Sequence, residues 1–145
     1  FLDPRNVGGP GAADRDGVTG HMHILPSPGR VGAAGATGVP NDLVVALLAL
    51  HHMGDIATVV QRCVDLLAEG GHVAIIDLDH DADGAFHQHV VDFDGHHGFT
   101  RDEMRGWLEA AGAVDVRVTD GGIVTKETED GERDFPLFLA VARQS

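Results

Sequence analysis

In this 145-residue chain, two histidines and two aspartates that could take part in catalysis lie at the ends of two apolar runs. His51 and His52 come directly after the run of residues 42–50, and Asp77 and Asp79 end a second run. An imidazole can act as a general base near neutral pH, and a carboxylate can orient a polar substrate. These four residues are therefore the predicted catalytic residues. The alternative is that the imidazoles pack or lie in solvent while the carboxylates cap a loop.

Residues 79–99 are rich in imidazole and carboxylate side chains. Ligands of these types at such density suit Zn, Fe, Mn or Ni, so a metal-binding protein is one hypothesis. The segment "DHDADG" lacks the bidentate glutamate of a calcium loop. We assign no metal ligands from the sequence alone. The residues concerned are His80, Asp81, Asp83, His87, His89, Asp92, Asp94, His96 and His97.

The elements that position these residues follow a strand–helix–strand pattern. The run of residues 42–50 is typical of a strand buried on both faces. Asp55 can cap a helix whose apolar positions recur as far as Leu67, and the glycine pair at 70–71 is predicted to end it. Residues 72–78 predict a second strand. Ligands of open parallel sheets bind outside the carboxyl ends of the strands.

Further along the chain, Thr100 and Glu103 have the spacing of a capping box that starts an amphipathic helix. Its predicted buried face consists of Met104, Trp107, Leu108 and Ala111. The pattern then predicts a strand at 114–118, an exposed hairpin or loop at 123–133, and a final apolar strand at 135–142. A short strand is also predicted near the start, at 21–25.

Four segments in this order, "DLVVALLALHHMGD", "LLAEGGHVAIIDLD", "FHQHVVDFDGHHGFTRDEMRGWLEAAGAVDVRV" and "FPLFLAVARQS", resemble the second half of class I S-adenosylmethionine-dependent methyltransferases. The resemblance covers residues 42–145. It implies an α/β domain with a Rossmann-like sheet whose last strand is antiparallel. In that arrangement the last strand inserts between the fifth and sixth strands, which gives the order fourth, fifth, seventh, sixth.

The preceding residues, 1–41, form a Gly/Pro-rich segment with weak periodicity. "FLDPRNVGGPG" resembles a degenerate form of the family's glycine-rich nucleotide loop, and "HILPSPGRV" resembles its second-strand turn. Leu25 then stands where the family has an acidic contact to the ribose. The sheet is therefore expected to be incomplete in its N-terminal half. The contacts to the methyl donor that the resemblance implies are Asp3, Gly8, Gly9, Gly11 and Leu50.

The resemblance implies methyl transfer from S-adenosylmethionine to a small-molecule acceptor. It places His51 and His52 along the donor and acceptor pocket and His87, His96 and His97 in a lid over the acceptor. Asp77 and Asp79 end the next strand and are expected to face the same crevice, where they could orient a polar acceptor. Loss of two or three hydrogen bonds in the glycine loop would cost about 2–5 kcal/mol and impair donor binding. Two alternatives stand beside it. One is a non-catalytic, truncated domain that a partner completes, with an exposed sheet edge that favours a homodimer. The other is the metal-binding protein.

Composition limits the classes of partner. The chain carries 10 basic and 23 acidic residues, a formal net charge of −13, which repels nucleic acid phosphates.

Cys63 is the single cysteine and cannot form an internal disulfide. No apolar run is long enough to cross a membrane and no secretory pattern is seen, so a cytoplasmic protein is expected. The start at Phe1 rather than Met indicates either a processed start or a piece of a longer protein.

Overall fold

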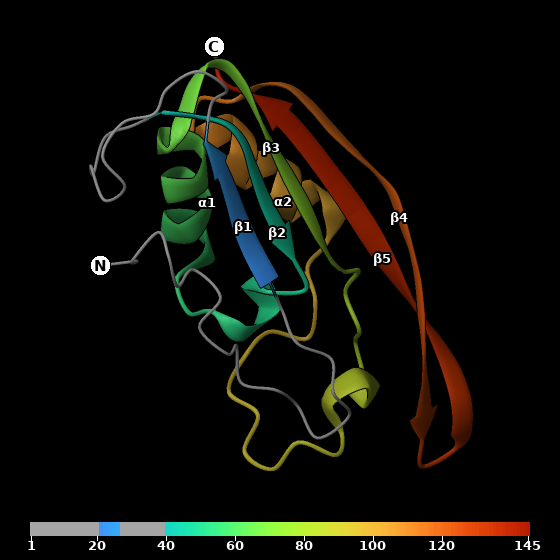
Figure 1. Cartoon of the computed structure of the whole chain (residues 1–145). Helices are drawn as coiled ribbons and strands as arrows, with labels where there is room; N and C mark the ends of the chain where they lie inside the picture. Colours follow the sequence, from blue (N-terminus) through green and yellow to red (C-terminus); the bar gives the residue numbers. More distant parts are fainter. Residues whose placement is uncertain (1–20, 27–39) are drawn as a thin grey trace.

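A computed structural model describes residues 21–26 and 40–145, and it shows a mixed five-stranded sheet with two α-helices on one face (Figure 1). The strands, in sheet order, are β1 (His21–Pro26), β2 (Asn41–Leu47), β3 (Leu67–Leu78), β5 (Gly131–Arg143) and β4 (Val114–Thr128). The helices are α1 (Ile56–Asp65), α2 (Arg101–Ala110) and the short 3-10 helices η1 (Leu50–His52) and η2 (Ala85–His87). Within the described part of the chain, no helix has both the length and the apolar character of a membrane span.

The predicted strand–helix–strand unit is confirmed. β2 and β3 pair in parallel, with Val44 opposite Val73, and α1 crosses between them. Asp55 caps α1 by accepting a hydrogen bond from the Thr58 backbone N–H at 3.2 Å, as the sequence predicts.

The predicted end of this helix is wrong. α1 ends at Asp65, and Leu67, which was placed on its apolar face, already pairs with Asn41 in the sheet. The Asn41 backbone N–H and side-chain amide both donate to the Leu66 carbonyl, at 2.8 and 2.9 Å. These bonds satisfy a helix-end carbonyl from outside the helix, so the chain turns into β3 before it reaches the glycine pair at 70–71.

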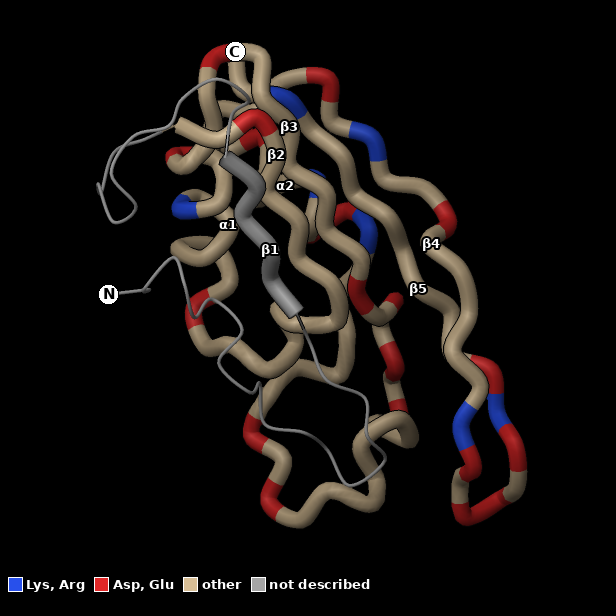
Figure 2. The backbone as a smooth tube through the Cα atoms, viewed as in Figure 1, with Lys and Arg blue, Asp and Glu red and all other residues tan. Residues whose placement is uncertain are grey.

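The C-terminal strands have the expected order. β5 lies antiparallel between β3 and β4, so the described sheet contains the order β2-β3-β5-β4. Of the two alternatives predicted for 123–133, a hairpin or a loop, the structure shows the hairpin, and β4 and β5 continue well past the predicted strands to meet at its tip. Charged residues gather at this tip and in the segment after β3 (Figure 2).

The predicted strand at 21–25 is also present as β1, and it pairs antiparallel with β2. This direction differs from the parallel order that a second strand of a Rossmann-like sheet would have. The segment "HILPSPGRV" therefore resembles the family's second-strand turn in sequence, but its strand does not have the direction of that second strand in the sheet. An antiparallel edge strand covers this side of β2 instead.

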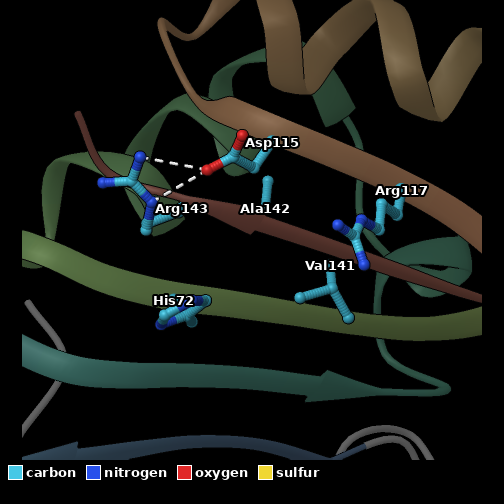
Figure 3. A pocket seen from close by; sticks show the side chains of 6 residues that line it. All are labelled: His72, Asp115, Arg117, Val141, Ala142 and Arg143. Carbon is cyan, nitrogen blue, oxygen red and sulfur yellow. Dashed lines mark hydrogen bonds and ion pairs between the residues drawn. The ribbon is translucent and has the colours of Figure 1, made fainter.

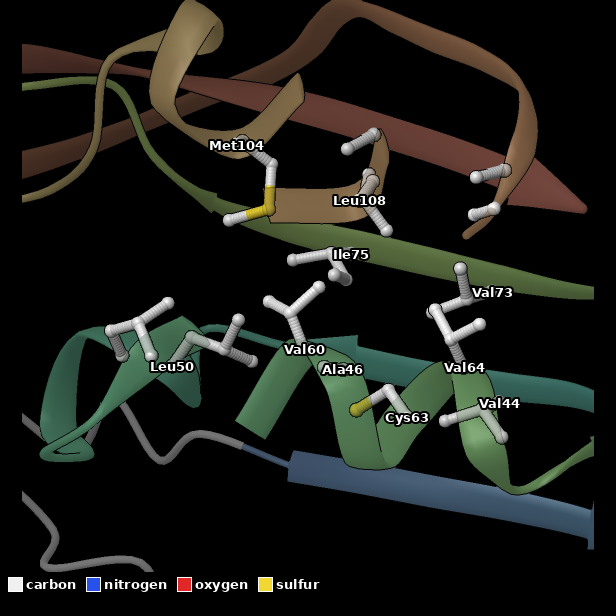
Figure 4. Packing of buried hydrophobic residues seen from close by; sticks show 14 of the residues in the cluster. Val44, Ala46, Leu50, Val60, Cys63, Val64, Val73, Ile75, Met104 and Leu108 are labelled. Atoms are coloured by element: carbon white, nitrogen blue, oxygen red, sulfur yellow. The ribbon is translucent and has the colours of Figure 1, made fainter. Parts of the chain in front are cut away.

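The main core lies between the helices and one face of the sheet (Figure 4). Alternate residues of β2 and β3 point into it, among them Val44 and Ile75, because successive side chains of a strand face opposite sides. A smaller apolar cluster lies under η2 and supports the segment after β3. Its buried members are Leu48, Leu78, Phe86, Phe135 and Leu137.

The predicted capping box of α2 is present and gives a stability prediction. The Glu103 backbone N–H donates to the Thr100 hydroxyl at 3.1 Å, and the Thr100 N–H donates to the Glu103 carboxylate at 2.8 Å. We expect Thr100→Ala to lower the free energy of unfolding by about 1 kcal/mol, as loss of such a cap usually does. Urea unfolding monitored by circular dichroism measures this. Glu109→Ala, an exposed change in the same helix, should stay within about 0.5 kcal/mol, and an equal loss in both variants would contradict the prediction.

Candidate functional site

Asp77 is fully buried at the carboxyl end of β3, where its carboxylate holds η1 in place. Its Oδ2 accepts hydrogen bonds from the backbone N–H groups of Leu50 at 3.0 Å and His51 at 3.3 Å. Its Oδ1 accepts from the Leu78 N–H at 2.8 Å and lies 2.6 Å from His51 Nδ1. One carboxylate therefore sets both the backbone of η1 and the orientation of the His51 ring.

This contact determines which nitrogen of His51 is free to react. An ionised carboxylate only accepts hydrogen bonds, so we assign the proton of the His51 ring to Nδ1 and the lone pair to Nε2. Nε2 is buried and has no hydrogen-bond partner among the described residues. A carboxylate that orients an imidazole in this way, with the second nitrogen open, is the arrangement of a general base.

Two further imidazoles surround His51. The His52 ring centroid lies 4.0 Å from that of His51, and the His87 centroid lies 5.0 Å from it. Phe93 stacks on His87 at 3.7 Å with an interplanar angle of 8°. One ring nitrogen from each of His51, His52 and His87 lies within 4.8 Å of the other two. We call these three residues the histidine cluster.

His87 is the most perturbed member of the cluster. Burial in the first place, and then the neighbouring His51, His52, Lys126 and His97, lower the pKa of His87 from 6.5 to about 3. Its imidazole is therefore neutral at pH 7. Neither of its ring nitrogens has a hydrogen-bond partner among the described residues.

The segment after β3 is fastened directly onto η1. The His96 N–H donates to the His51 carbonyl at 2.7 Å, and His96 Nε2 lies 3.1 Å from the Gly54 carbonyl oxygen. Gly95 makes this approach possible, since a Cβ there would lie 2.3 Å from the His51 carbonyl oxygen. Two segments distant in sequence thus enclose the histidine cluster.

Asp79 is the second carboxylate predicted to lie beside the acceptor. It directly follows β3, and its backbone forms an isolated parallel bridge with Phe99. Its carboxylate accepts hydrogen bonds from the Arg101 guanidinium of α2, at 2.8 and 3.1 Å, and a role in binding an acceptor stays a prediction. The Asp79 side chain is 22% exposed in this ion pair.

The other predicted site residues fall into three groups. Leu50 is fully buried in the core, His96 is half-buried, and His97 is exposed with its ring 6.1 Å from that of His87. Of the predicted metal-binding segment, His87 is the one residue that joins a group of potential metal ligands within residues 40–145. The predicted donor contacts Asp3, Gly8, Gly9 and Gly11 lie outside the described residues.

Sequence reasoning missed the residues that hold η2 beside η1. Lys126 Nζ donates to the Phe86 carbonyl at 2.8 Å and lies 4.1 Å from the centroid of the Phe86 ring. The buried Asp81 carboxylate accepts from the Phe86 N–H at 2.9 Å. One indication was available, since Lys126 is the only lysine of the chain and lies on a predicted hairpin.

A surface pocket of about 340 Å³ lies at the opposite end of the sheet (Figure 3). It includes His72 at the amino-terminal part of β3, together with the ion pair between Arg143 and Asp115 at 3.0 Å. Ligands of parallel sheets bind at the carboxyl ends of the strands, which is where Asp77 and η1 lie. The histidine cluster is therefore the stronger candidate for the functional site.

Neither a protein-family model nor a curated protein sequence matches this chain. Solved structures do match. A SAM-dependent methyltransferase of Thermotoga maritima shares 12% identity and a TM-score of 0.52 over 72% of this chain. A SAM-dependent methyltransferase of Methanosarcina mazei also shares 12% identity and a TM-score of 0.52 over 72% of this chain. Human N-acetylserotonin methyltransferase in complex with SAM gives 18% identity and a TM-score of 0.53, again over 72% of this chain.

The chain spans 56%, 59% and 30% of the lengths of these three proteins. At such identities the likeness shows the fold. The strand order and the antiparallel β5 agree with it. The chain has an incomplete, Rossmann-like, class I methyltransferase-like fold.

Proposed function

We propose that this protein transfers a methyl group from S-adenosylmethionine to a small-molecule acceptor, with His51 as the general base. The observation that carries the proposal is the contact of 2.6 Å between Asp77 and His51, at the carboxyl edge of the parallel strands β2 and β3. The methyltransferase-like fold supports the choice of reaction.

The described residues fit the acceptor side of such a site. When bound, S-adenosylmethionine supplies an electrophilic methyl group on a sulfonium centre. Asp77 holds the His51 ring so that Nε2 presents its lone pair, and Nε2 can take the proton that an acceptor hydroxyl or amine loses on methylation. Binding the acceptor in a fixed position supplies much of the remaining rate.

Access to Nε2 requires the covering segment to move. His51 is fully buried, and the His87 ring that lies beside it is itself covered by Phe93, which stacks on it. The covering residues belong to the segment 79–99, which the His96 N–H ties to the His51 carbonyl. In the proposed function this segment is a lid that opens to admit the acceptor and closes to exclude water.

The test is methyl transfer from radiolabelled S-adenosylmethionine to a panel of small phenols, amines and carboxylic acids. We expect His51→Gln to lower the rate by about 10²–10⁴-fold, the usual contribution of a general base. Binding of S-adenosylhomocysteine should be unchanged in that variant. His80→Gln, a change at an exposed histidine of the same segment, is the matched control. An unchanged rate in His51→Gln would remove His51 from the mechanism.

A further inference from the structure

The histidine cluster contains three buried ring nitrogens without a hydrogen-bond partner among the described residues, whereas a general base uses one. These atoms are His51 Nε2 and both ring nitrogens of His87. A buried polar atom in that state is unfavourable, because it has lost its hydrogen bonds to water and gained none within the protein. Both residues are almost completely buried, at 0% and 2% exposure, so bulk water does not compensate them.

The chemistry of the cluster matches a transition metal ion. Three imidazoles from two separate elements, η1 and η2, bring one nitrogen each to within 4.8 Å of the others. Neutral imidazole is a preferred ligand of Zn²⁺, and three histidines are a known complete set of protein ligands for it. We propose that His51, His52 and His87 bind a divalent transition metal ion of the Zn²⁺ class, with a fourth position left for water.

Asp77 provides the outer support that such sites use. A histidine that binds a metal usually donates its second ring N–H to a carboxylate, which fixes the tautomer and orients the ring. Asp77 Oδ1 lies 2.6 Å from His51 Nδ1, and the backbone bonds to Asp77 hold that carboxylate in place. His51 is thereby prepared to bind through Nε2.

The distances define how the cluster must adjust. Nitrogen ligands at about 2.1 Å from a tetrahedral ion are roughly 3.4 Å apart, which is closer than the 4.8 Å limit of the cluster. Any two of these nitrogen atoms that lie near that limit would have to approach each other on binding. His87 lies in the 3-10 helix η2, between irregular segments of the chain, so it is the member best placed to shift.

The metal proposal does not rest on methyl transfer. An ion on His51 Nε2 would use the same lone pair that a general base needs. Metal binding and base catalysis at His51 would therefore exclude each other, and added Zn²⁺ would inhibit methyl transfer. The binding measurement below has its own readout, so the two proposals can fail separately.

The test is a titration of the full chain, freed of metal with a chelator, with Zn²⁺ by calorimetry and with Co²⁺ by visible absorption. We expect one ion per chain and the intense d–d bands of four-coordinate Co²⁺. His52→Ala, at a half-buried position, and His87→Gln should each weaken binding by at least about 10-fold, the loss that even an outer-shell change can cause. His80→Ala and His89→Ala, at exposed positions of the segment 79–99, are the matched controls.

Absence of stoichiometric binding by the folded wild-type chain would overturn the proposal, whatever the variants do. Equal affinity in wild type, His52→Ala and His87→Gln would also overturn it. A loss of affinity in His80→Ala or His89→Ala alone would assign the ion to the exposed residues instead. Circular dichroism of each variant separates a lost site from a lost fold.

Discussion

Replacement of Asp77 by alanine is expected to lower the free energy of unfolding by about 3–5 kcal/mol. The Asp77 carboxylate accepts from the backbone N–H groups of Leu50, His51 and Leu78 and contacts the His51 ring. Removing it leaves these donors buried without an acceptor. A domain of ordinary stability has about 5–15 kcal/mol in total, so the loss would be severe.

Urea unfolding monitored by Trp107 fluorescence and circular dichroism measures this loss. Asp79→Ala is the matched control, since it removes a carboxylate two residues away whose ion pair with Arg101 is partly exposed. That change should cost about 1 kcal/mol or less. Asp77→Asn keeps the size of the side chain but presents an NH₂ group to donors, so it too should be clearly less stable than wild type. Equal losses at positions 77 and 79 would contradict the role given to Asp77.

The second large effect is expected on lowering the pH, through His87. Burial lowers the pKa of His87 in the folded chain to about 3, against 6.5 in the unfolded chain. Between these values the unfolded chain binds a proton that the folded chain does not. The stability linked to His87 is therefore complete above pH 6.5 and is lost as the pH falls toward 3, by up to about 1.4 kcal/mol per pH unit.

Urea unfolding at pH 7, 6, 5 and 4.5, with a chelator present, tests this dependence. Wild type should lose stability with a slope that approaches the one-proton value below pH 6. His87→Gln cannot titrate, so its stability should fall less steeply, whatever its stability at pH 7. The range above pH 4.5 matters because the carboxylates Asp55 and Asp83, whose pKa values are lowered by their hydrogen bonds, titrate below it. Identical slopes in the two proteins would contradict a neutral, buried His87.

The elements could be predicted where the sequence pattern and the local chemistry agree. The parallel strands β2 and β3, the Asp55 cap and the capping box at Thr100 all follow from residues near one another in the chain. The strand order around β5 was expected from the family resemblance, and the structure confirms it. The end of α1 was missed because hydrogen bonds from Asn41, distant in sequence, override the local apolar pattern.

The site could be predicted only in part, for the same physical reason. Asp77 lies at the end of a recognisable strand and His51 shortly follows another, so their positions at one sheet edge could be expected. The approach of His87 to them depends on how residues 79–99 fold over η1. That path is set by tertiary contacts, such as the His96 N–H to the His51 carbonyl and the burial of Lys126 against Phe86, which no local pattern specifies.

Calorimetric titration with S-adenosylhomocysteine tests most directly whether this chain uses S-adenosylmethionine. The predicted donor contacts lie in the Gly/Pro-rich segment 1–41, so the full chain is the protein to titrate. We expect saturable binding of one molecule per chain, with an affinity lowered by the degenerate glycine loop. No detectable binding by a chain whose circular dichroism shows it to be folded would contradict autonomous methyl transfer. That result would favour a non-catalytic domain that needs a partner to complete it.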